Sequence, residues 1–597
     1  MSSPAIAASV AAVLAVVWTL GACALPARPA LERLAAGLLC VYGVAGLAML
    51  QGPLHVSFLA HPWLVRIVSL AGLAAALAWR RPSLRPAGLR AFPLAGATAL
   101  VALMAIPAWR APVGSHAVSH QDMQWHEGWI RQLLGGAHAP GGVYAGEPNS
   151  YPWLYHSLTA WVAQALPGGV DEALVTVDVL GLVTIGVGMW LLARELGGGA
   201  PAAGVATLLA LAGGGVGWVW QHSPAAVLNM SADDLGRYHG DLVLSNALVP
   251  GMGNLPPLVP RDLGVCLAPL VLWALVRALA ARSRAGLLAA GGGAGLVSLC
   301  APLAGLFLAV WGAALAIRAR EIAALWAGLA GVVIAGIWLA PLAVTYHRYG
   351  GFVDITAQPP TNPTVAEAAV ALGIALPLGL AGLVLAGRSD PRLAILVGIP
   401  AAACALGVAM GEGGTLFGTA ALLRWLRYVP FLALGLAAPG GLAAERALTA
   451  LARPAAVLAV AAGTAAALAS TALAAVELGR SHAPQTLTCS SLPFRYGDLF
   501  AVVTKPQLEA DRASLDVFAE TGASAAYMTL FRAKVRARNF PDRPPTQAQR
   551  RRWRDELRSG RSPIPQTVWV VGATGGPHVA ACSLGGRPAV LVRYPPA

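Results

Sequence analysis

The segment SHQDMQWHEGWIRQLL, residues 119–134, concentrates ionisable side chains in a chain that is otherwise mostly apolar. On a helix, Asp122 and His126 lie on neighbouring turns of one face, while Glu127 and Arg131 form a separate i, i+4 pair. A carboxylate such as Asp122 can accept the proton of an attacking hydroxyl. The alternative interpretation is structural, with a surface ion pair between Glu127 and Arg131 and solvated histidines.

An aromatic stretch follows, GGVYAGEPNSYPWLYHSLTAWV, residues 141–162. Tyr and Trp concentrate where a membrane meets water. We therefore expect 119–134 and 152–166 to be short amphipathic helices at the membrane surface, where they could hold a lipid-linked molecule beside a polar site. The side chains predicted to contact such a molecule or its reaction partner are Trp125, His126, Glu127, Arg131, Tyr151, Trp153 and Tyr155.

The elements that position these residues are predicted to cross a membrane. The chain is 57% hydrophobic and only 11% charged, whereas soluble proteins carry roughly 25% charged residues. Apolar runs of about 20 residues recur, as bilayer-spanning helices require. The first run lacks a preceding Lys or Arg, so we interpret it as a spanning helix and not as a cleaved signal peptide.

Spanning helices are predicted along residues 1–477, which form a mainly α, polytopic domain of about 13–14 spans. The pair 285–299 and 302–317 could instead be one broken element around Pro302. The predicted spans are 4–25, 31–51, 62–79, 92–109, 174–193, 201–220, 263–281, 285–299, 302–317, 322–345, 365–387, 392–410, 428–444 and 454–477.

Arginines fix the predicted orientation, because Arg accumulates in cytoplasmic loops. The net charge of +14 rests on Arg, since Lys occurs only at Lys505 and Lys534. All 12 His fall in the alternate, outer segments or at their boundaries. Because the Arg residues are scattered over short loops, a nucleic-acid partner is excluded. The cytoplasmic groups are Arg28 and Arg33; Arg80, Arg81, Arg85 and Arg90; Arg194; Arg282 and Arg284; Arg318 and Arg320; Arg388 and Arg392; and Arg446 and Arg453.

Two outer loops, 110–173 and 221–262, are far longer than connectors, and long loops are commonly functional. Short inner loops and long outer loops favour an enzyme that works on the outer face. A transporter or flippase of a lipid-linked intermediate is the alternative, and a non-catalytic scaffold is a third. A transporter would place ionisable side chains inside its spans, which here are nearly free of them.

Residues 478–597 are predicted to form a small extracytoplasmic α+β domain. Helices are expected at 513–538 and 543–560, and strands at 567–573 and 588–595. Cys489 and Cys582 are the only two cysteines of this tail. In an oxidising compartment they are predicted to form a disulfide.

If the outer site transfers a group from a lipid phosphate, the leaving phosphate needs cationic or hydrogen-bonding partners. Candidates are Arg261 in NLPPLVPRDLG, His347 and Arg348 in TYHRYG, and Arg424 and Arg427 in LLRWLRY. For each Arg, anchoring to lipid headgroups is the alternative role.

A divalent cation is left open by the sequence. Asp233, Asp234, His239 and Asp241 could bind one, largely through oxygens, or could form a solvated loop. The chain contains no HExxH, GxxxxGK[ST], GxSxG or CxxC pattern, so no motif supports a protease, an NTPase or a lipase.

The stretches HQDMQWHEGWIRQLL and SYPWLYHSLTAWV, each near a predicted span, resemble the galactan arabinofuranosyltransferases, which build the bacterial arabinogalactan wall. The resemblance implies a multi-pass GT-C glycosyltransferase of the bacterial plasma membrane with a small extracytoplasmic C-terminal domain. It also implies transfer of arabinofuranose from decaprenyl-phospho-arabinose to a galactan hydroxyl with inversion, outside the cell. Asp122 would be the general base.

Overall fold

The computed structural model describes the helical part of the chain and five strands near its end. The described residues are 3–82, 126, 129–130, 132–140, 152–166, 169–213, 260–349, 369, 372–409, 428–459, 461–463, 465–466, 486–489, 492–495, 567–571, 578–584 and 587–593.

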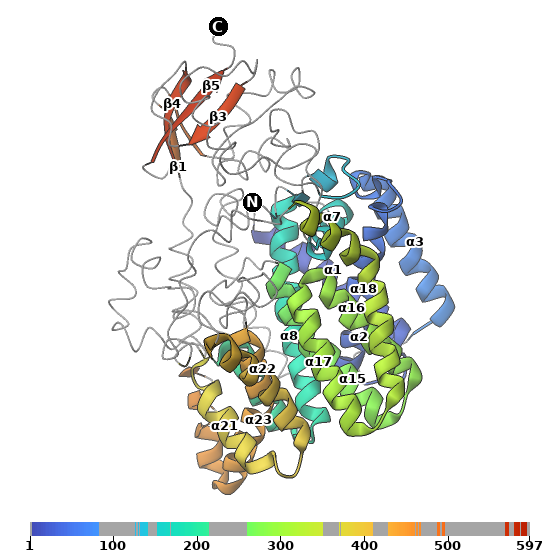
Figure 1. Ribbon diagram of the computed structural model, residues 1–597, viewed down its shortest axis with the longest axis vertical. Helices are drawn as coiled ribbons and strands as arrows, with labels where there is room; N and C mark the ends of the chain where they lie inside the picture. The colour runs from blue at the N-terminus through green and yellow to red at the C-terminus, as the bar shows by residue number, and fades with distance from the viewer. Residues whose placement is uncertain are drawn as a thin grey trace.

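In the described part of the chain, eight helices are long and apolar enough to cross a membrane. The prediction of a mainly helical, polytopic membrane protein is confirmed (Figure 1). The predicted span 92–109 lies outside the described residues. The eight helices are α1 (Ser3–Ala24), α2 (Ala30–Ala48), α3 (Pro62–Arg80), α8 (Val170–Glu195), α15 (Pro260–Ala281), α17 (Pro302–Ala319), α18 (Ile322–Tyr349) and α23 (Val429–Ala450).

Shorter apolar helices complete the bundle: α9 (Ala200–Ala212), α16 (Arg284–Cys300), α21 (Ala375–Ala386) and α22 (Pro391–Ala409). A further apolar helix begins at Arg453, and most of the predicted span 454–477 lies outside the described residues. The lengths of α9 and α21 differ from the prediction, since α9 stops before Gly213 and α21 begins at Ala375. The Gly213 carbonyl accepts a hydrogen bond of 2.9 Å from Ile374 N–H, which joins the two helix ends.

The region around Pro302 forms two helices. Helix α16 begins at a Ser283 side chain that caps the Gly286 N–H, and it ends at Cys300. Ala301 is extended, with φ −150° and ψ 105°, and Pro302 begins α17. Proline suits the first helical position because the N–H it lacks would have no partner in the helix.

Glycines allow α16 and α18 to pack with their backbones in contact. A Cβ on Gly291 would overlap the carbonyl oxygen of Ala327, and one on Gly331 would overlap that of Gly291. Small residues four apart permit this approach between membrane helices. The same device joins α1 to α2, where a Cβ on Gly21 would meet the Arg33 carbonyl.

Helix α8 lies at the centre of the bundle, with 83% of its apolar window buried, whereas 6% of α3 and 22% of α18 are buried. Large exposed side chains follow these two outer helices, including Trp63, Trp79, Trp326 and Val333. Such faces fit contact with lipid tails, because apolar side chains are favoured in the hydrocarbon core.

Charged contacts gather several helix ends at one end of the bundle. Arg277 Nη1 lies 2.7 Å from Glu32 Oε1 and 4.0 Å from Glu195 Oε2, which joins α2, α8 and α15. Glu445 of α23 accepts a bond of 3.0 Å from the N–H of Gly199, at the start of α9. These ends flank the arginine-rich loops predicted to be cytoplasmic. Their common end is confirmed, and the side of the membrane stays a prediction.

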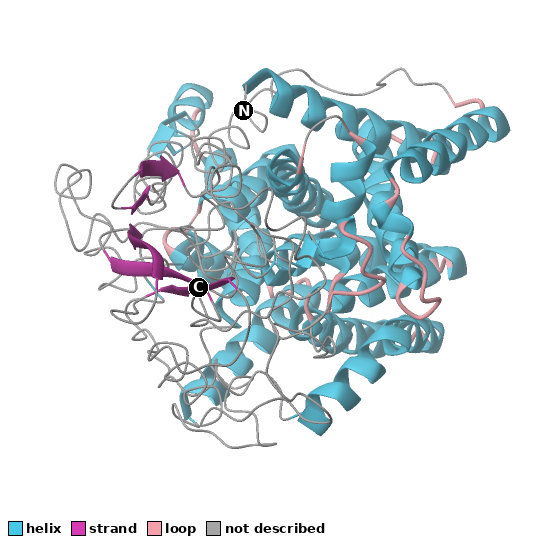
Figure 2. Cartoon of the chain, turned by 90° about the horizontal axis from the view of Figure 1, so that it is seen from above, coloured by secondary structure: helices cyan, strands magenta, loops and turns pink. Residues whose placement is uncertain are grey.

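The described strands of the tail form one antiparallel sheet, ordered β2-β1-β4-β5-β3 (Figure 2). The predicted β-rich runs near the chain end are confirmed as β3 and β5, while both predicted tail helices and the boundary at 477/478 lie outside the described residues. The strands are β1 (Thr486–Cys489), β2 (Leu492–Arg495), β3 (Thr567–Val571), β4 (His578–Leu584) and β5 (Arg587–Arg593).

The register of β1 and β4 bears on the predicted disulfide. Cys489 and Cys582 are direct cross-strand partners. Directly opposed residues of antiparallel strands have Cα atoms about 4.5–5.5 Å apart, within the range of roughly 4.4–6.8 Å that a disulfide requires. The pairing therefore permits the bond, which stays a prediction.

Candidate functional site

Two predicted short helices meet at the end of the bundle opposite the charged contacts. The described residues of segment 119–134 that precede residue 135 are helical, and 152–166 contains α7 (Leu154–Ala165). The Ser157 hydroxyl donates a hydrogen bond of 2.8 Å to the Ala45 carbonyl near the end of α2. Gln164 Nε2 donates one of 3.0 Å to the Leu59 carbonyl. These bonds attach α7 to the segment that links α2 with α3.

The structure differs from the expected amphipathic helices on the membrane surface. Residues Leu154 to Ala160 of α7 are all buried, against α2, α3 and α8. Ile130 and Leu133 of the preceding segment are fully buried too. Trp153 and Tyr155 belong to this core, so the structure gives them a packing role, and their predicted contact with a substrate stays a proposal. The aromatic pattern was interpreted as interfacial because it shares its composition with a buried helix.

A histidine pair lies where the two segments meet. His126 Nδ1 and His156 Nε2 are 2.9 Å apart, so one nitrogen donates and the other accepts. The Trp129 ring lies 5.5 Å from the His126 ring and 5.2 Å from the His156 ring. Tyr155 stands edge-on to His156 at 5.6 Å. His126 is 5% exposed and His156 is not exposed at all. The pair is thus enclosed by aromatic rings, and His156 was not among the predicted site residues.

Burial lowers the pKa of His156 from its ordinary 6.5 to about 3. A charged imidazole is disfavoured without water around it. His156 is therefore neutral at neutral pH, and it supplies hydrogen bonds and no positive charge.

Acidification should destabilise the protein through His156. Between pH 6.5 and about 3 the unfolded chain binds this proton and the folded chain does not, so unfolding becomes easier as the pH falls. One proton contributes a slope of up to about 1.4 kcal/mol per pH unit. Thermal unfolding in detergent from pH 7 to 4 should show a shallower loss for His156→Gln than for wild type. Parallel curves would contradict the assignment.

A second buried polar group surrounds the start of α15. Arg261 Nε lies 3.3 Å from the Asp262 carboxylate, and Asp262 has no exposed surface. Asp178 of α8 is also fully buried, and both carboxylates lie within electrostatic range of Cys266. Arg261 therefore emerges beside buried negative charge, which fixes the direction of its guanidinium.

Asp178 is a residue that the sequence reasoning missed. It lies inside a spanning helix, in VTVDVLG, where the expectation was an almost uncharged interior. Ionisable residues within membrane spans are rare and commonly functional. A single Asp in an apolar run was the available signal.

Several predicted site residues lie outside the described part of the chain: Asp122, Trp125, Glu127, Arg131, Tyr151, Arg424 and Arg427. His347 and Arg348 belong to the last turn of α18, and their side chains are not described. The structure therefore brings His126, Trp153 and Tyr155 together, with Arg261 at the start of α15.

No group of three or more His, Cys, Asp or Glu side chains in the described residues could hold a metal ion. The loop residues Asp233, Asp234, His239 and Asp241 lie outside that part of the chain. A divalent cation thus stays a proposal.

Comparison with known proteins finds two partial structural likenesses. No family model and none of the curated proteins matches the chain. The crystal structure of the Archaeoglobus fulgidus oligosaccharyltransferase in the apo form is 12% identical, with a TM-score of 0.44 over 80% of this chain and 69% of the other. The archaeal oligosaccharyltransferase AglB from Archaeoglobus fulgidus, in complex with an inhibitory peptide and a dolichol-phosphate, is 13% identical. Its TM-score is 0.36, over 76% of this chain and 65% of the other.

Proposed function

We propose that this protein is an inverting, GT-C-type glycosyltransferase of the bacterial plasma membrane. It moves a sugar, arabinofuranose, from a polyprenyl-phosphate donor to a hydroxyl of a cell-wall galactan on the outer face. The supporting observation is the enclosed His126–His156 pair, with N···N 2.9 Å. His126 follows Asp122 by one helical turn, so a helical segment would carry the carboxylate beside this pair.

In the proposed reaction, the galactan hydroxyl oxygen attacks the anomeric carbon of the donor sugar. The proton of this hydroxyl passes to Asp122 as the new C–O bond forms. The bond from the anomeric carbon to the phosphate oxygen breaks, and polyprenyl phosphate leaves on the opposite face. A single displacement inverts the anomeric carbon. His156 is neutral and adds no positive charge that would weaken Asp122 as a base.

Arg261 is proposed to bind the donor phosphate. An Arg fork matches phosphate oxygens, and the Asp262 carboxylate at 3.3 Å orients the guanidinium. Arg261→Ala should raise the KM for the donor about tenfold or more, while the KM for the acceptor stays near wild type. Arg261→Lys retains the charge and should recover part of the loss.

Because Asp262 is buried, thermal unfolding of the Arg261 variants must accompany the kinetics. A folded Arg261→Ala protein with an unchanged donor KM would reduce Arg261 to a membrane anchor.

Asp178 favours a second candidate, a transporter or flippase of a lipid-linked intermediate, because such proteins place ionisable groups inside their spans. Purified protein in detergent separates the two functions, since transfer needs no closed compartment and transport does. A pentose added to a galactan acceptor supports the enzyme. Movement of a labelled polyprenyl-phosphate sugar across proteoliposomes, without product in detergent, supports the transporter.

A further inference from the structure

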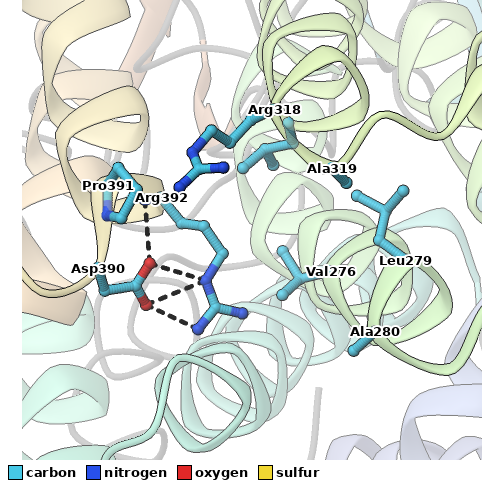
Figure 3. Close-up of a pocket in the computed structure, with 9 residues that line it drawn as sticks. Val276, Leu279, Ala280, Arg318, Ala319, Asp390, Pro391 and Arg392 are labelled. Carbon is cyan, nitrogen blue, oxygen red and sulfur yellow. Dashed lines mark hydrogen bonds and ion pairs between the residues drawn. The ribbon is translucent and has the colours of Figure 1, made fainter.

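A pocket of about 260 Å³ lies at the arginine-rich end of the bundle, far along the helices from the histidine pair. It opens between the last turns of α15 and α17 and the first turn of α22 (Figure 3). Val276, Leu279 and Leu315 form its apolar wall, while Arg318, Asp390 and Arg392 supply its charges.

The three charged groups of the pocket are not equally satisfied. Asp390 binds Arg392 through both oxygens, with Nε at 2.8 and 3.0 Å and Nη2 at 2.7 Å, and also accepts from the Arg392 N–H at 3.0 Å. Arg318 has no hydrogen bond or ion pair within the described residues, and it is exposed. In Figure 3 its side chain extends from α17 toward Arg392. Two guanidiniums and one carboxylate leave one positive charge, located on Arg318.

The surroundings decide which anion fits. One wall of the pocket is hydrocarbon, and neighbouring outward side chains such as Ile317 are apolar and exposed. The pocket therefore combines a cation with a greasy wall at a helix terminus, where the headgroups of one leaflet lie. A phosphodiester that carries acyl chains satisfies both parts, while a free phosphate satisfies only the first. Basic pockets between spanning helices on the cytoplasmic side bind anionic headgroups in this way.

We propose that this pocket binds an anionic phospholipid, with the phosphodiester on Arg318 and the start of an acyl chain against α15 and α17. Asp390 holds Arg392 in place and shields it, so Arg318 makes the main contact. This site is independent of sugar transfer and lies at the other end of the helices.

Native mass spectrometry of the full-length protein tests the proposal, after exchange from detergent into nanodiscs of phosphatidylglycerol or phosphatidylcholine. Wild type should retain phosphatidylglycerol after release and should retain phosphatidylcholine much less. Arg318→Ala should lose retained phosphatidylglycerol about five- to tenfold. Arg284→Ala is the matched control, because Arg284 is exposed at the neighbouring start of α16 and does not line the pocket. It should behave as wild type.

Equal loss in Arg318→Ala and Arg284→Ala would overturn the site, as would equal retention of the two lipids by wild type. A third arm measures thermal unfolding in detergent with inorganic phosphate or with phosphatidylglycerol. Stabilisation by the lipid alone supports the proposal. Equal stabilisation by millimolar phosphate, lost in Arg318→Ala, would identify a soluble anion as the occupant and overturn the lipid assignment.

Discussion

Replacement of Asp122 by asparagine is expected to lower sugar transfer by at least about 100-fold, because the amide has nearly the same shape but cannot accept the hydroxyl proton. The effect should fall on kcat, since the proton moves only as the bond forms, while both KM values should change little. Purified protein in detergent, incubated with decaprenyl-phospho-arabinose and a short galactan, gives the measurement. Mass spectrometry of the acceptor then reports one added pentose.

Glu127→Gln is the matched control for this experiment, because Glu127 lies in the same segment on a different helical face. It should retain most of the transfer rate. Wild-type rates in Asp122→Asn would remove Asp122 as the base. If folded wild type adds no pentose, the arabinose assignment is wrong, and donors that carry other sugars, beginning with mannose, test the reaction class.

Replacement of Gly291 by alanine is expected to destabilise the bundle by about 1–3 kcal/mol, as overpacking does. The new Cβ would overlap the Ala327 carbonyl oxygen, which is backbone and cannot rotate away. The two helices must then separate, which also weakens the neighbouring contact of Gly295 with Gly331. Thermal unfolding of the purified protein in one detergent measures the loss.

Gly292 is the matched control on the same helix, because nothing lies within 4 Å of the Cβ that alanine would add there. Gly292→Ala should leave stability unchanged or raise it by up to about 1 kcal/mol, since alanine favours a helix over glycine. The two neighbouring substitutions should therefore shift the unfolding temperature in opposite directions. Equal shifts would show that the contact between α16 and α18 is looser than described.

Hydropathy predicted most of the helices, because a span is a property of one segment and its length follows from bilayer thickness. Contacts between distant segments could not be predicted in this way. The His126–His156 pair joins residues 30 apart, and its burial depends on helices that lie elsewhere in the chain. The same holds for Gly291, whose small size was visible in the sequence but whose partner Ala327 was not.

The apolar character of α7 also led to a wrong prediction of its position. Tyr155 and Trp153 fit a membrane surface as well as a protein core, and only the packing of α2 and α8 decides between them. Asp178 was overlooked for the opposite reason, since one charge barely changes the mean hydropathy of a long apolar run. Sequence averages thus describe the solvent of a helix better than its chemistry.

The two ends of α9 have a consequence for how the chain is inserted into the membrane. At 13 residues, α9 is short for a span, and its terminal backbone groups contact Glu445 and Ile374, which are synthesised much later. While the ribosome still holds those residues, α9 lacks both partners. The helix would therefore remain incompletely settled near the translocation channel until α23 emerges. Completion of this part of the bundle becomes a late step of biogenesis, set by the last spans and not by the order of the sequence.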